Sequence, residues 1–377
     1  MTKRRRTFKI NEIDKNFQMA KVGDLDARYF DALNAPFELE GFPWRDPARI
    51  FNRLPASFTE NDVNVWAMTI EKTTAGGAVR FRTDSPCLTL RAVLDHSFDM
   101  NHMPRAGSAG FDLYSGSGKD IQYRKTVQPD RDQIDLETLL VSEQPEQMTD
   151  YILYLPLYGA ASKIEIGVAP WAKLEKPVPH AVSKSVLFYG SSITQGGCAS
   201  RPGNAYTTML CRALDAPQIN LGFSGSCHCE PAVAEAIAGL DLAAFVMDYD
   251  HNAASPEHLK NTHEIFFKII RGKNHGLPVI IISRCDFWGS QEDKDRRDVI
   301  RQTYENAVKA GDKKVWFIDG ETLFGMEDRD ACTVDRVHPN DLGFYRMFRT
   351  ILPTLENALE RAKATGIMSS EVKDGQV

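Results

Sequence analysis

The second half of the chain alternates short apolar runs with longer amphipathic segments, and this rhythm limits the possible folds more than any other feature. Each apolar run is too short for a helix and lacks the alternation of a strand with one face in water. Such runs are typical of strands that are buried on both faces of a parallel sheet. The strands expected on this basis are residues 186–189, 218–221, 243–249, 278–283 and 315–319.

Helical patterns occupy the gaps between these runs. Residues 293–310 place Ile300, Tyr304 and Val308 on one stripe, and residues 341–359 repeat the pattern with phenylalanine and leucine. Alternating strands and helices predict a doubly wound, three-layer α/β/α domain with a parallel sheet. In such a domain, ligand chemistry is expected at the carboxyl ends of the strands.

The first half of the chain has a different character. Between about residues 58 and 168, short alternating or β-branched runs are separated by turn residues, without a long helical pattern. This pattern predicts an antiparallel β-sandwich of jelly-roll-like topology. Its expected strands are residues 63–70, 78–82, 87–93, 110–114, 151–157 and 163–168.

Charged residues and two prolines, Pro177 and Pro179, separate the two patterns. We therefore expect three parts. The β-sandwich domain with an N-terminal extension is expected at residues 1–175, the α/β domain at residues 180–365, and a C-terminal tail at residues 366–377.

Polar groups follow several of the predicted strands of the α/β domain. The segment Ser185–Thr194 reads Ser-Val-Leu-Phe-Tyr-Gly-Ser-Ser-Ile-Thr, so hydroxyl groups follow the first buried strand. Gly225 and Asn252 follow the next two strands and can donate hydrogen bonds. Asp335 and His338, three residues apart, precede the last helix and supply a carboxylate and an imidazole. We expect these groups to meet at one edge of the sheet.

Taken in this order, the segments resemble the SGNH (GDSL-type) hydrolases, a family of esterases, acetyl-ester hydrolases, lipases and some acyltransferases. The resemblance covers roughly residues 182–359. Gly190 matches the glycine of the Gly-Asp-Ser block of the family, which implies that Ser192 is the nucleophile. The Asp-x-x-His block implies that Asp335 and His338 complete a catalytic triad.

The chemistry of these side chains agrees with the roles that the resemblance implies. The Ser192 hydroxyl does not ionise near pH 7, so it needs an adjacent base, which His338 can provide. Asp335 can orient the imidazole and stabilise its charged form. The N–H groups of Ser192 and Gly225 and the amide of Asn252 would form an oxyanion hole. This chemistry needs neither a cofactor nor a metal.

The third block departs from the family pattern. The family usually has Gly-x-Asn-Asp there, whereas this chain has Asp250-His251-Asn252-Ala253. His251 is therefore a rival base, although a histidine in the oxyanion block is poorly placed to accept the serine proton. Cys227-His228-Cys229 offers metal-ligand side chains, but adjacent residues of a strand point to opposite faces, so we expect no metal site there.

Two residues are expected to line the substrate site. Trp288 follows the fourth strand of the parallel sheet, at its functional edge. Arg105 belongs to a glycine-rich stretch of the sandwich, residues 102–110, which could reach across to the site.

Several two-domain members of the family resemble carbohydrate esterases. This resemblance implies a carboxylic-ester hydrolase that removes short acyl groups, above all acetyl, from a carbohydrate through an acyl-enzyme. An acyltransferase would use the same acyl-enzyme with a second alcohol or amine as acceptor. A non-catalytic carbohydrate-binding protein on the same scaffold is a third reading.

Charge and composition bear on partners and location. The net charge is −6 without a basic stripe, which argues against nucleic acid. No segment approaches the ~20 continuous apolar residues of a membrane span. The basic start lacks the apolar core of a secretory signal, and the seven cysteines are an odd number, which predicts reduced thiols in the cytoplasm. We expect a cytoplasmic enzyme for a small-molecule ester and leave its oligomeric state open.

Overall fold

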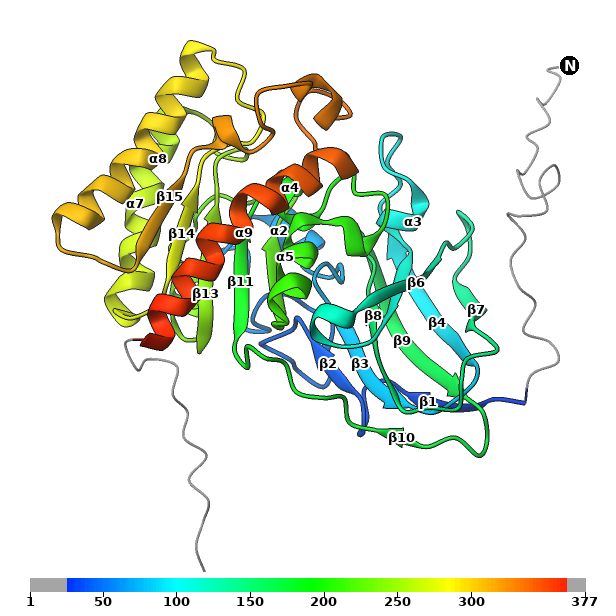
Figure 1. Cartoon of the computed structure of the whole chain (residues 1–377). Coiled ribbons are helices and arrows are strands. Elements are labelled where there is room, and N and C mark those ends of the chain that lie inside the picture. Colours follow the sequence, from blue (N-terminus) through cyan, green and yellow to red (C-terminus); the bar gives the residue numbers. More distant parts are fainter. Residues whose placement is uncertain (1–25, 365–377) are drawn as a thin grey trace, which may run out of the picture.

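The computed structural model describes residues 26–364, in which an antiparallel β-sandwich packs against a three-layer α/β domain (Figure 1). Residues 1–25 and the expected tail at residues 366–377 lie outside the described residues. Within the described part of the chain, no helix combines the length and the apolar character that crossing a membrane requires.

The parallel sheet of the α/β domain has the strands that the apolar runs predicted. They are β11 (Ser185–Gly190), β12 (Gln218–Gly222), β13 (Leu242–Asp248), β14 (Val279–Ile282) and β15 (Val315–Ile318), in the spatial order β12-β11-β13-β14-β15. All neighbouring pairs are parallel. The next strand along the chain lies on one side of β11 and the one after it lies on the other. The topological switch point, where ligands bind in such folds, is therefore at the end of β11.

Helices cover both faces of this sheet. On one face lie α5 (Tyr206–Leu214) and α9 (Asp341–Ala364), and on the other lie α6 (Pro231–Ala238), α7 (Pro256–Lys273) and α8 (Gln291–Lys309) (Figure 1). Side chains of β11 alternate between the two cores, with Val186 and Phe188 on the α5 side and Leu187 and Tyr189 on the α7 side. The fold class predicted from the sequence is confirmed.

The stripe predicted for α8 is wrong at one position. Ile300, Thr303 and Ala307 are buried, whereas Val308 is 46% exposed. The face that packs on the sheet follows the spacing of three and four residues through Ala307, and Val308 lies one position beyond it.

The sandwich consists of two antiparallel sheets around one apolar core. One sheet has the order β1 (Arg28–Asp31), β9 (Gly159–Val168), β4 (Leu88–Ser97), β7 (Asp135–Val141). The other has the order β10 (Leu174–Glu175), β3 (Ala78–Thr83), β8 (Thr149–Tyr154), β5 (Phe111–Ser115), β6 (Gln122–Val127), and β2 (Glu38–Glu40) pairs with β3.

Apolar runs predicted β3, β4, β5, β8 and β9, but not the remaining strands of the sandwich. Strand β6, for example, reads Gln-Tyr-Arg-Lys-Thr-Val and is largely exposed, so it carries little hydrophobic periodicity. Its pairing with β5 defines it instead.

The strand predicted at residues 63–70 is wrong, because the segment forms helix α2 (Val65–Ile70). The Asn64 side chain caps this helix by accepting a hydrogen bond from the N–H of Ala67 (3.0 Å). Ala67 and Ile70, three residues apart, are buried in the same core as strand β12 of the α/β domain. Packing against the second domain therefore decides the structure of this segment.

Arg53 joins the N-terminal half to the end of β12. It is completely buried, and its guanidinium donates to the carbonyls of Thr73 (3.0 Å), Asn220 (3.1 Å) and Gly222 (2.6 Å). The group also lies over the ring of Phe223, 4.7 Å from its centroid. Burial lowers the pKa of Arg53 to about 10, so the group still carries its charge near neutral pH. The segment around Arg53 is thereby tied to the strand that leads to Gly225.

His180 in the linker joins the domains at a second place. Its Nδ1 lies 2.7 Å from Oδ1 of Asp215, and its Nε2 lies 3.0 Å from Oε1 of Glu40, which also pairs with Arg80 (3.0 Å). Burial opposes the charge of the imidazole, but hydrogen bonds to Glu40 and then Asp215 outweigh it and raise the pKa of His180. The imidazole thus bridges a carboxylate of each domain.

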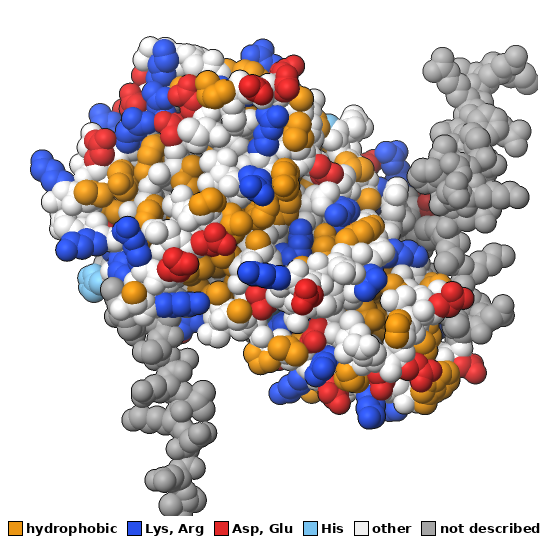
Figure 2. All heavy atoms as spheres, in the orientation of Figure 1, with side chains coloured by type: hydrophobic (Ala, Val, Ile, Leu, Met, Phe, Trp, Pro, Cys, Tyr) orange, Lys and Arg blue, Asp and Glu red, His pale blue; other side chains and the backbone are white. Residues whose placement is uncertain are grey.

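Most of the described charged side chains lie on the surface, whereas the cysteine thiols lie in the interior. On the face shown in Figure 2, basic and acidic side chains are interspersed. All seven cysteines are buried free thiols.

Short helical turns complete the described chain at Arg105–Ser108 (α3), Ser192–Gln195 (α4), Gly118–Asp120, Pro202–Asn204, Gly320–Thr322 and Arg329–Cys332.

Candidate active site

A tight turn between β11 and α4 presents Ser192. Ser191 caps α4, and its Oγ accepts a hydrogen bond from the N–H of Ile193 (3.2 Å), so Ser192 is the first residue of the helix. A Cβ on Gly190 would lie 2.2 Å from Oγ1 of Thr194 and 2.5 Å from a backbone oxygen on β13. Only glycine fits there, and the local sequence therefore permits an abrupt change from strand to helix. Ser191 is fully buried, whereas Ser192 is 7% exposed.

Ser192, His338 and Asp335 form a continuous chain of hydrogen bonds. Ser192 Oγ lies 2.9 Å from Nε2 of His338, and Nδ1 of His338 lies 2.7 Å from Oδ2 of Asp335. The other carboxylate oxygen of Asp335 accepts from the backbone N–H groups of His338 (2.7 Å) and Val337 (3.0 Å). Partial burial raises the pKa of Asp335, but these hydrogen bonds outweigh it and lower the pKa below its ordinary value. The carboxylate is therefore ionised at neutral pH.

Two of the predicted oxyanion groups lie on loops that follow β12 and β13. Gly225 has φ +67°, a conformation that glycine adopts without strain. The side-chain carbonyl of Asn252 accepts from the N–H of Cys227 (3.4 Å), which orients its NH₂ group away from that backbone. The hydrogen bond also links the two loops that carry Gly225 and Asn252.

Gln195, which the sequence analysis did not single out, positions the nucleophile helix relative to its surroundings. Its Oε1 accepts from the N–H of Ser224 (3.0 Å), next to Gly225, and its Nε2 donates to the carbonyl of Leu157 in the sandwich (3.0 Å). Tyr158 donates to the carbonyl of Ser192 at 3.4 Å. Since all of these partners are remote in the sequence, no local pattern could have revealed them.

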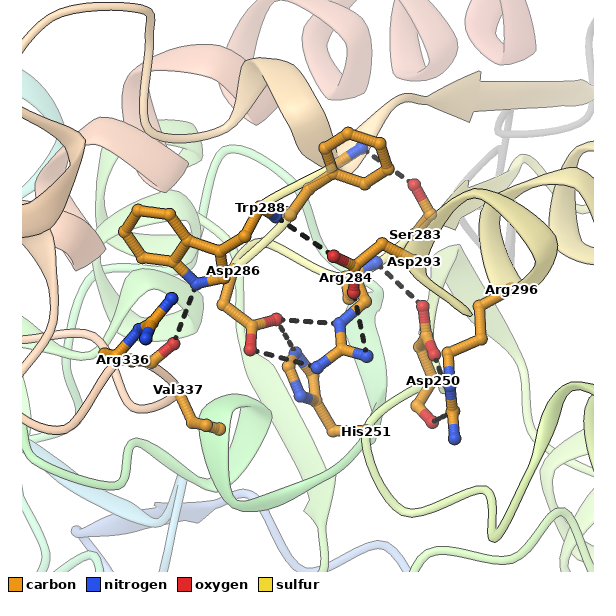
Figure 3. Close-up of polar contacts among 12 residues, drawn as sticks. Asp250, His251, Ser283, Arg284, Asp286, Trp288, Asp293, Arg296, Arg336 and Val337 are labelled. Atoms are coloured by element: carbon orange, nitrogen blue, oxygen red, sulfur yellow. Dashed lines mark hydrogen bonds and ion pairs between the residues drawn. The ribbon is translucent and has the colours of Figure 1, made fainter. Parts of the chain in front are cut away.

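His251, the rival base, is held in a different place. Its Nε2 lies 3.2 Å from Oδ1 of Asp286, and Asp286 also receives two hydrogen bonds from Arg284, at 2.9 and 3.0 Å (Figure 3). Burial lowers the pKa of His251, and the Asp286 carboxylate only partly offsets this. The neighbouring Asp250 pairs with Arg296 (3.2 Å). The ionisable residues of the third block therefore belong to a buried network, while the serine hydroxyl faces His338.

Trp288 lies beside the loop that carries His338. Its ring N–H donates to the carbonyl of Arg336 (3.2 Å), and the guanidinium of Arg336 lies 5.2 Å from the ring centroid (Figure 3). The side chain is 40% exposed, and the guanidinium of Arg329 also lies near the ring, 5.8 Å from its centroid. The expected role of Trp288 in substrate binding stays a prediction.

The stretch at residues 102–110 does reach the triad, through His102. The rings of His102 and His338 meet edge to face, with centroids 5.5 Å apart. Arg105, by contrast, donates to Ser97 Oγ and to the carbonyl of Asp130 (3.3 Å), both within the sandwich. The substrate role expected for Arg105 stays a prediction, and His102 is the residue of this stretch that contacts the candidate base.

Comparisons with known proteins agree with this architecture. Residues 183–356 match the GDSL-like lipase/acylhydrolase family, and residues 27–174 match a family described as the N-terminus of SGNH-hydrolase-type esterases. No curated protein sequence matches the chain.

Solved structures with both domains are similar over most of the chain. A Bacteroides ovatus protein described as a GDSL-like lipase is 29% identical with a TM-score of 0.79, covering 89% of this chain and 98% of that one. A salicylyl-acyltransferase from a tetracycline biosynthetic pathway is 19% identical (TM-score 0.71; coverage 91% and 98%). A family two carbohydrate esterase from Cellvibrio japonicus is 11% identical (TM-score 0.60; coverage 89% and 98%) and, like the acyltransferase, shows the shared fold.

Proposed function

The chain belongs to the GDSL-like lipase/acylhydrolase family and is a carboxylic-ester hydrolase, and from this premise we propose that it removes a short acyl group, acetyl above all, from a carbohydrate through an acyl-enzyme on Ser192. The observation that carries this proposal is the hydrogen-bonded chain from Ser192 Oγ through the His338 imidazole to the Asp335 carboxylate.

The first half of the reaction forms the acyl-enzyme. His338 Nε2 removes the proton of Ser192 as Oγ attacks the ester carbonyl carbon, and the Asp335 carboxylate stabilises the resulting imidazolium. The negative charge that develops on the carbonyl oxygen is stabilised by the N–H groups of Ser192 and Gly225 and by the amide of Asn252. The imidazolium then protonates the leaving alcohol.

The second half of the reaction releases the acyl group. Water attacks the acyl carbon while His338 Nε2 accepts its proton, and Ser192 Oγ leaves with a proton from the same imidazolium. None of these reaction steps requires a metal or an organic cofactor. An alcohol that replaced water in this step would make the protein an acyltransferase.

The surroundings of Ser192 support a small acyl group and a sugar. Ser192 is only 7% exposed, which favours a small acyl group. Two exposed tryptophans lie on segments that contact the loops of the site. Trp288 flanks the His338 loop, and Trp66, 67% exposed, lies on α2, whose cap residue Asn64 donates to the carbonyl of Ser226 beside the oxyanion loop (2.8 Å). An indole offers a flat apolar face against which the C–H face of a sugar ring can pack.

We also propose that the sandwich selects the alcohol part of the ester. Its contact between His102 and His338 supports this role, as pockets often form between domains. Removing the sandwich would not test the role cleanly, because Met103, Leu157 and Tyr158 pack in the same core as Ile193 of the nucleophile helix. A substitution of His102 leaves that core intact.

The function can be tested with matched ester substrates. We expect p-nitrophenyl acetate to be hydrolysed faster than longer acyl esters, and acetylated saccharides to release acetate. His102→Ala should lower kcat/KM on acetylated saccharides more than on p-nitrophenyl acetate, with Ser192→Ala as the inactive control. Release of acetate from none of these esters would contradict the proposal. Transfer of the acyl group to an added alcohol in preference to water would favour the acyltransferase.

A further inference from the structure

Three side chains with metal-binding atoms converge at the candidate active site. They are His102, Cys198 and His338, and their potential ligand atoms all lie within 4.8 Å of one another. The three come from the sandwich, from the turn that follows the nucleophile helix, and from the loop before α9. The cluster exists only because the two domains meet there.

The turn after α4 brings the Cys198 thiol into this cluster. Gly196 and Cys198 both have positive φ, +103° and +76°, and a Cβ on the intervening Gly197 would lie 3.5 Å from Cδ2 of His338. The left-handed conformation costs a residue with a Cβ ~1 kcal/mol or more, and such strain is concentrated at functional sites. A glycine at position 198 would avoid that cost. The feature that cysteine has and glycine lacks is the thiol.

We propose that His102, Cys198 and His338 bind a divalent cation that prefers nitrogen and sulfur ligands, of which Zn²⁺ is the type, and that this cation blocks the esterase. Zinc bonds of about 2.0–2.1 Å to nitrogen and 2.3 Å to sulfur place tetrahedral ligand atoms roughly 3.3–3.6 Å apart. Closing the present spacing to that range requires movements of about 1 Å, which the exposed His102 can make. The fourth position is left to water or to Ser192 Oγ, which lies 2.9 Å from Nε2 of His338.

The local charge suits a cation. Asp335 is hydrogen-bonded to His338, and the negative charge of its carboxylate also interacts electrostatically with the Cys198 thiol. A second group of potential ligands in the described part of the chain, His251, Cys285 and Asp286, differs in this respect. There the Arg284 guanidinium already pairs with both carboxylate oxygens of Asp286. A metal ion at that second group would meet a fixed positive charge.

Binding of the cation is coupled to the loss of one proton. Coordination replaces the S–H bond by a metal–sulfur bond and releases the proton to solvent. The cation also takes the lone pair of His338 Nε2 that would accept the serine proton. The inhibition therefore rests on the proposed function, whereas metal binding does not.

Binding is tested on the Ser192→Ala protein, so that the outcome is independent of turnover. Titration with Co²⁺, which reports on zinc sites, should produce a thiolate-to-cobalt charge-transfer band in the near ultraviolet at one ion per chain. The band should disappear in Ser192→Ala/Cys198→Ser and weaken in Ser192→Ala/His102→Gln, an exposed substitution that does not endanger folding. Ser192→Ala/Cys211→Ser, which removes a buried thiol on α5, is the matched control and should keep the band. A missing band, or one that survives the loss of Cys198, would overturn the site.

Inhibition is tested on the enzyme with its serine in place. Zn²⁺ should abolish p-nitrophenyl acetate hydrolysis, and a chelator should restore it. Relative to its own metal-free rate, Cys198→Ser should need at least ~10-fold more Zn²⁺ for half inhibition, because even an outer-sphere partner contributes that much to metal affinity. Equal sensitivity of the two proteins would refute inhibition through this site. If Ser192→Ala gave the cobalt band but the protein with Ser192 in place showed no esterase activity, the metal site would stand and the proposed function would be rejected.

Discussion

Replacing Ser192 with alanine is expected to abolish ester hydrolysis while changing the free energy of unfolding very little. The hydroxyl that is removed makes a hydrogen bond of 2.9 Å to His338, and a hydrogen bond of this kind contributes ~1 kcal/mol to stability. Loss of a triad serine lowers turnover by up to ~10⁶, which corresponds to about 8 kcal/mol of transition-state stabilisation. The effect on catalysis should therefore greatly exceed the effect on folding.

The adjacent Ser191 provides a matched control of the same residue type. Its Oγ caps α4 by accepting from the N–H of Ile193, and loss of such a cap costs about 0.5–2 kcal/mol of stability. Ser191→Ala and Ser192→Ala should thus lose similar, small amounts of stability, while only Ser192→Ala loses activity. The two changes in stability can be compared by urea unfolding followed by circular dichroism.

The assay is the initial rate of p-nitrophenyl acetate hydrolysis, combined with labelling by a serine-directed phosphonate. The wild-type protein and Ser191→Ala should be labelled, and Ser192→Ala should not. A folded Ser192→Ala protein that kept more than on the order of 10⁻³ of wild-type turnover would refute the assignment of the nucleophile. A stable Ser191→Ala protein without activity would equally refute it.

Four further predictions follow from contacts described above. Asn252→Ala should lower kcat by ~10² to 10³ with little change in KM. His251→Gln should change kcat by less than about tenfold, that is, by less than ~1.4 kcal/mol, and the opposite ranking would identify His251 as the base. Because the folded pKa of His180 is raised above the ordinary 6.5, its contribution to stability should be complete below about pH 6.5 and be lost as pH rises through the folded value. Urea unfolding of wild type and His180→Gln across this range should show the slope in wild type alone. Arg53→Met should lower the free energy of unfolding by ~3–5 kcal/mol, since buried carbonyls lose their donor and a charge is removed from a hydrogen-bonded network. A loss below ~1 kcal/mol would show that these hydrogen bonds contribute little.

Hydrophobic patterning alone determined the layers of the catalytic domain and the edge of the sheet where its chemistry lies. Continuous apolar runs mark strands buried on both faces, and the carboxyl ends of parallel strands share one edge, so Ser192, Gly225 and Asn252 could be assigned to that edge from the sequence. The family pattern then supplied Asp335 and His338. The β-sandwich was predicted as a class, but exposed strands such as β6 have no such pattern and remained undetected.

Only the tertiary structure decided which distant groups meet. Residues 63–70 alternate like a strand but form α2, because an Asn64 cap and burial against the second domain outweigh the local pattern. From the sequence, His251 of the third block was a rival base. In the structure His251 pairs with Asp286, and this contact fixes its orientation. The contact of His102 with His338 and the burial of Arg53 likewise join segments far apart in the chain. Hydrophobic periodicity reports which faces of an element are buried, whereas the partners on those faces depend on how whole elements and domains pack.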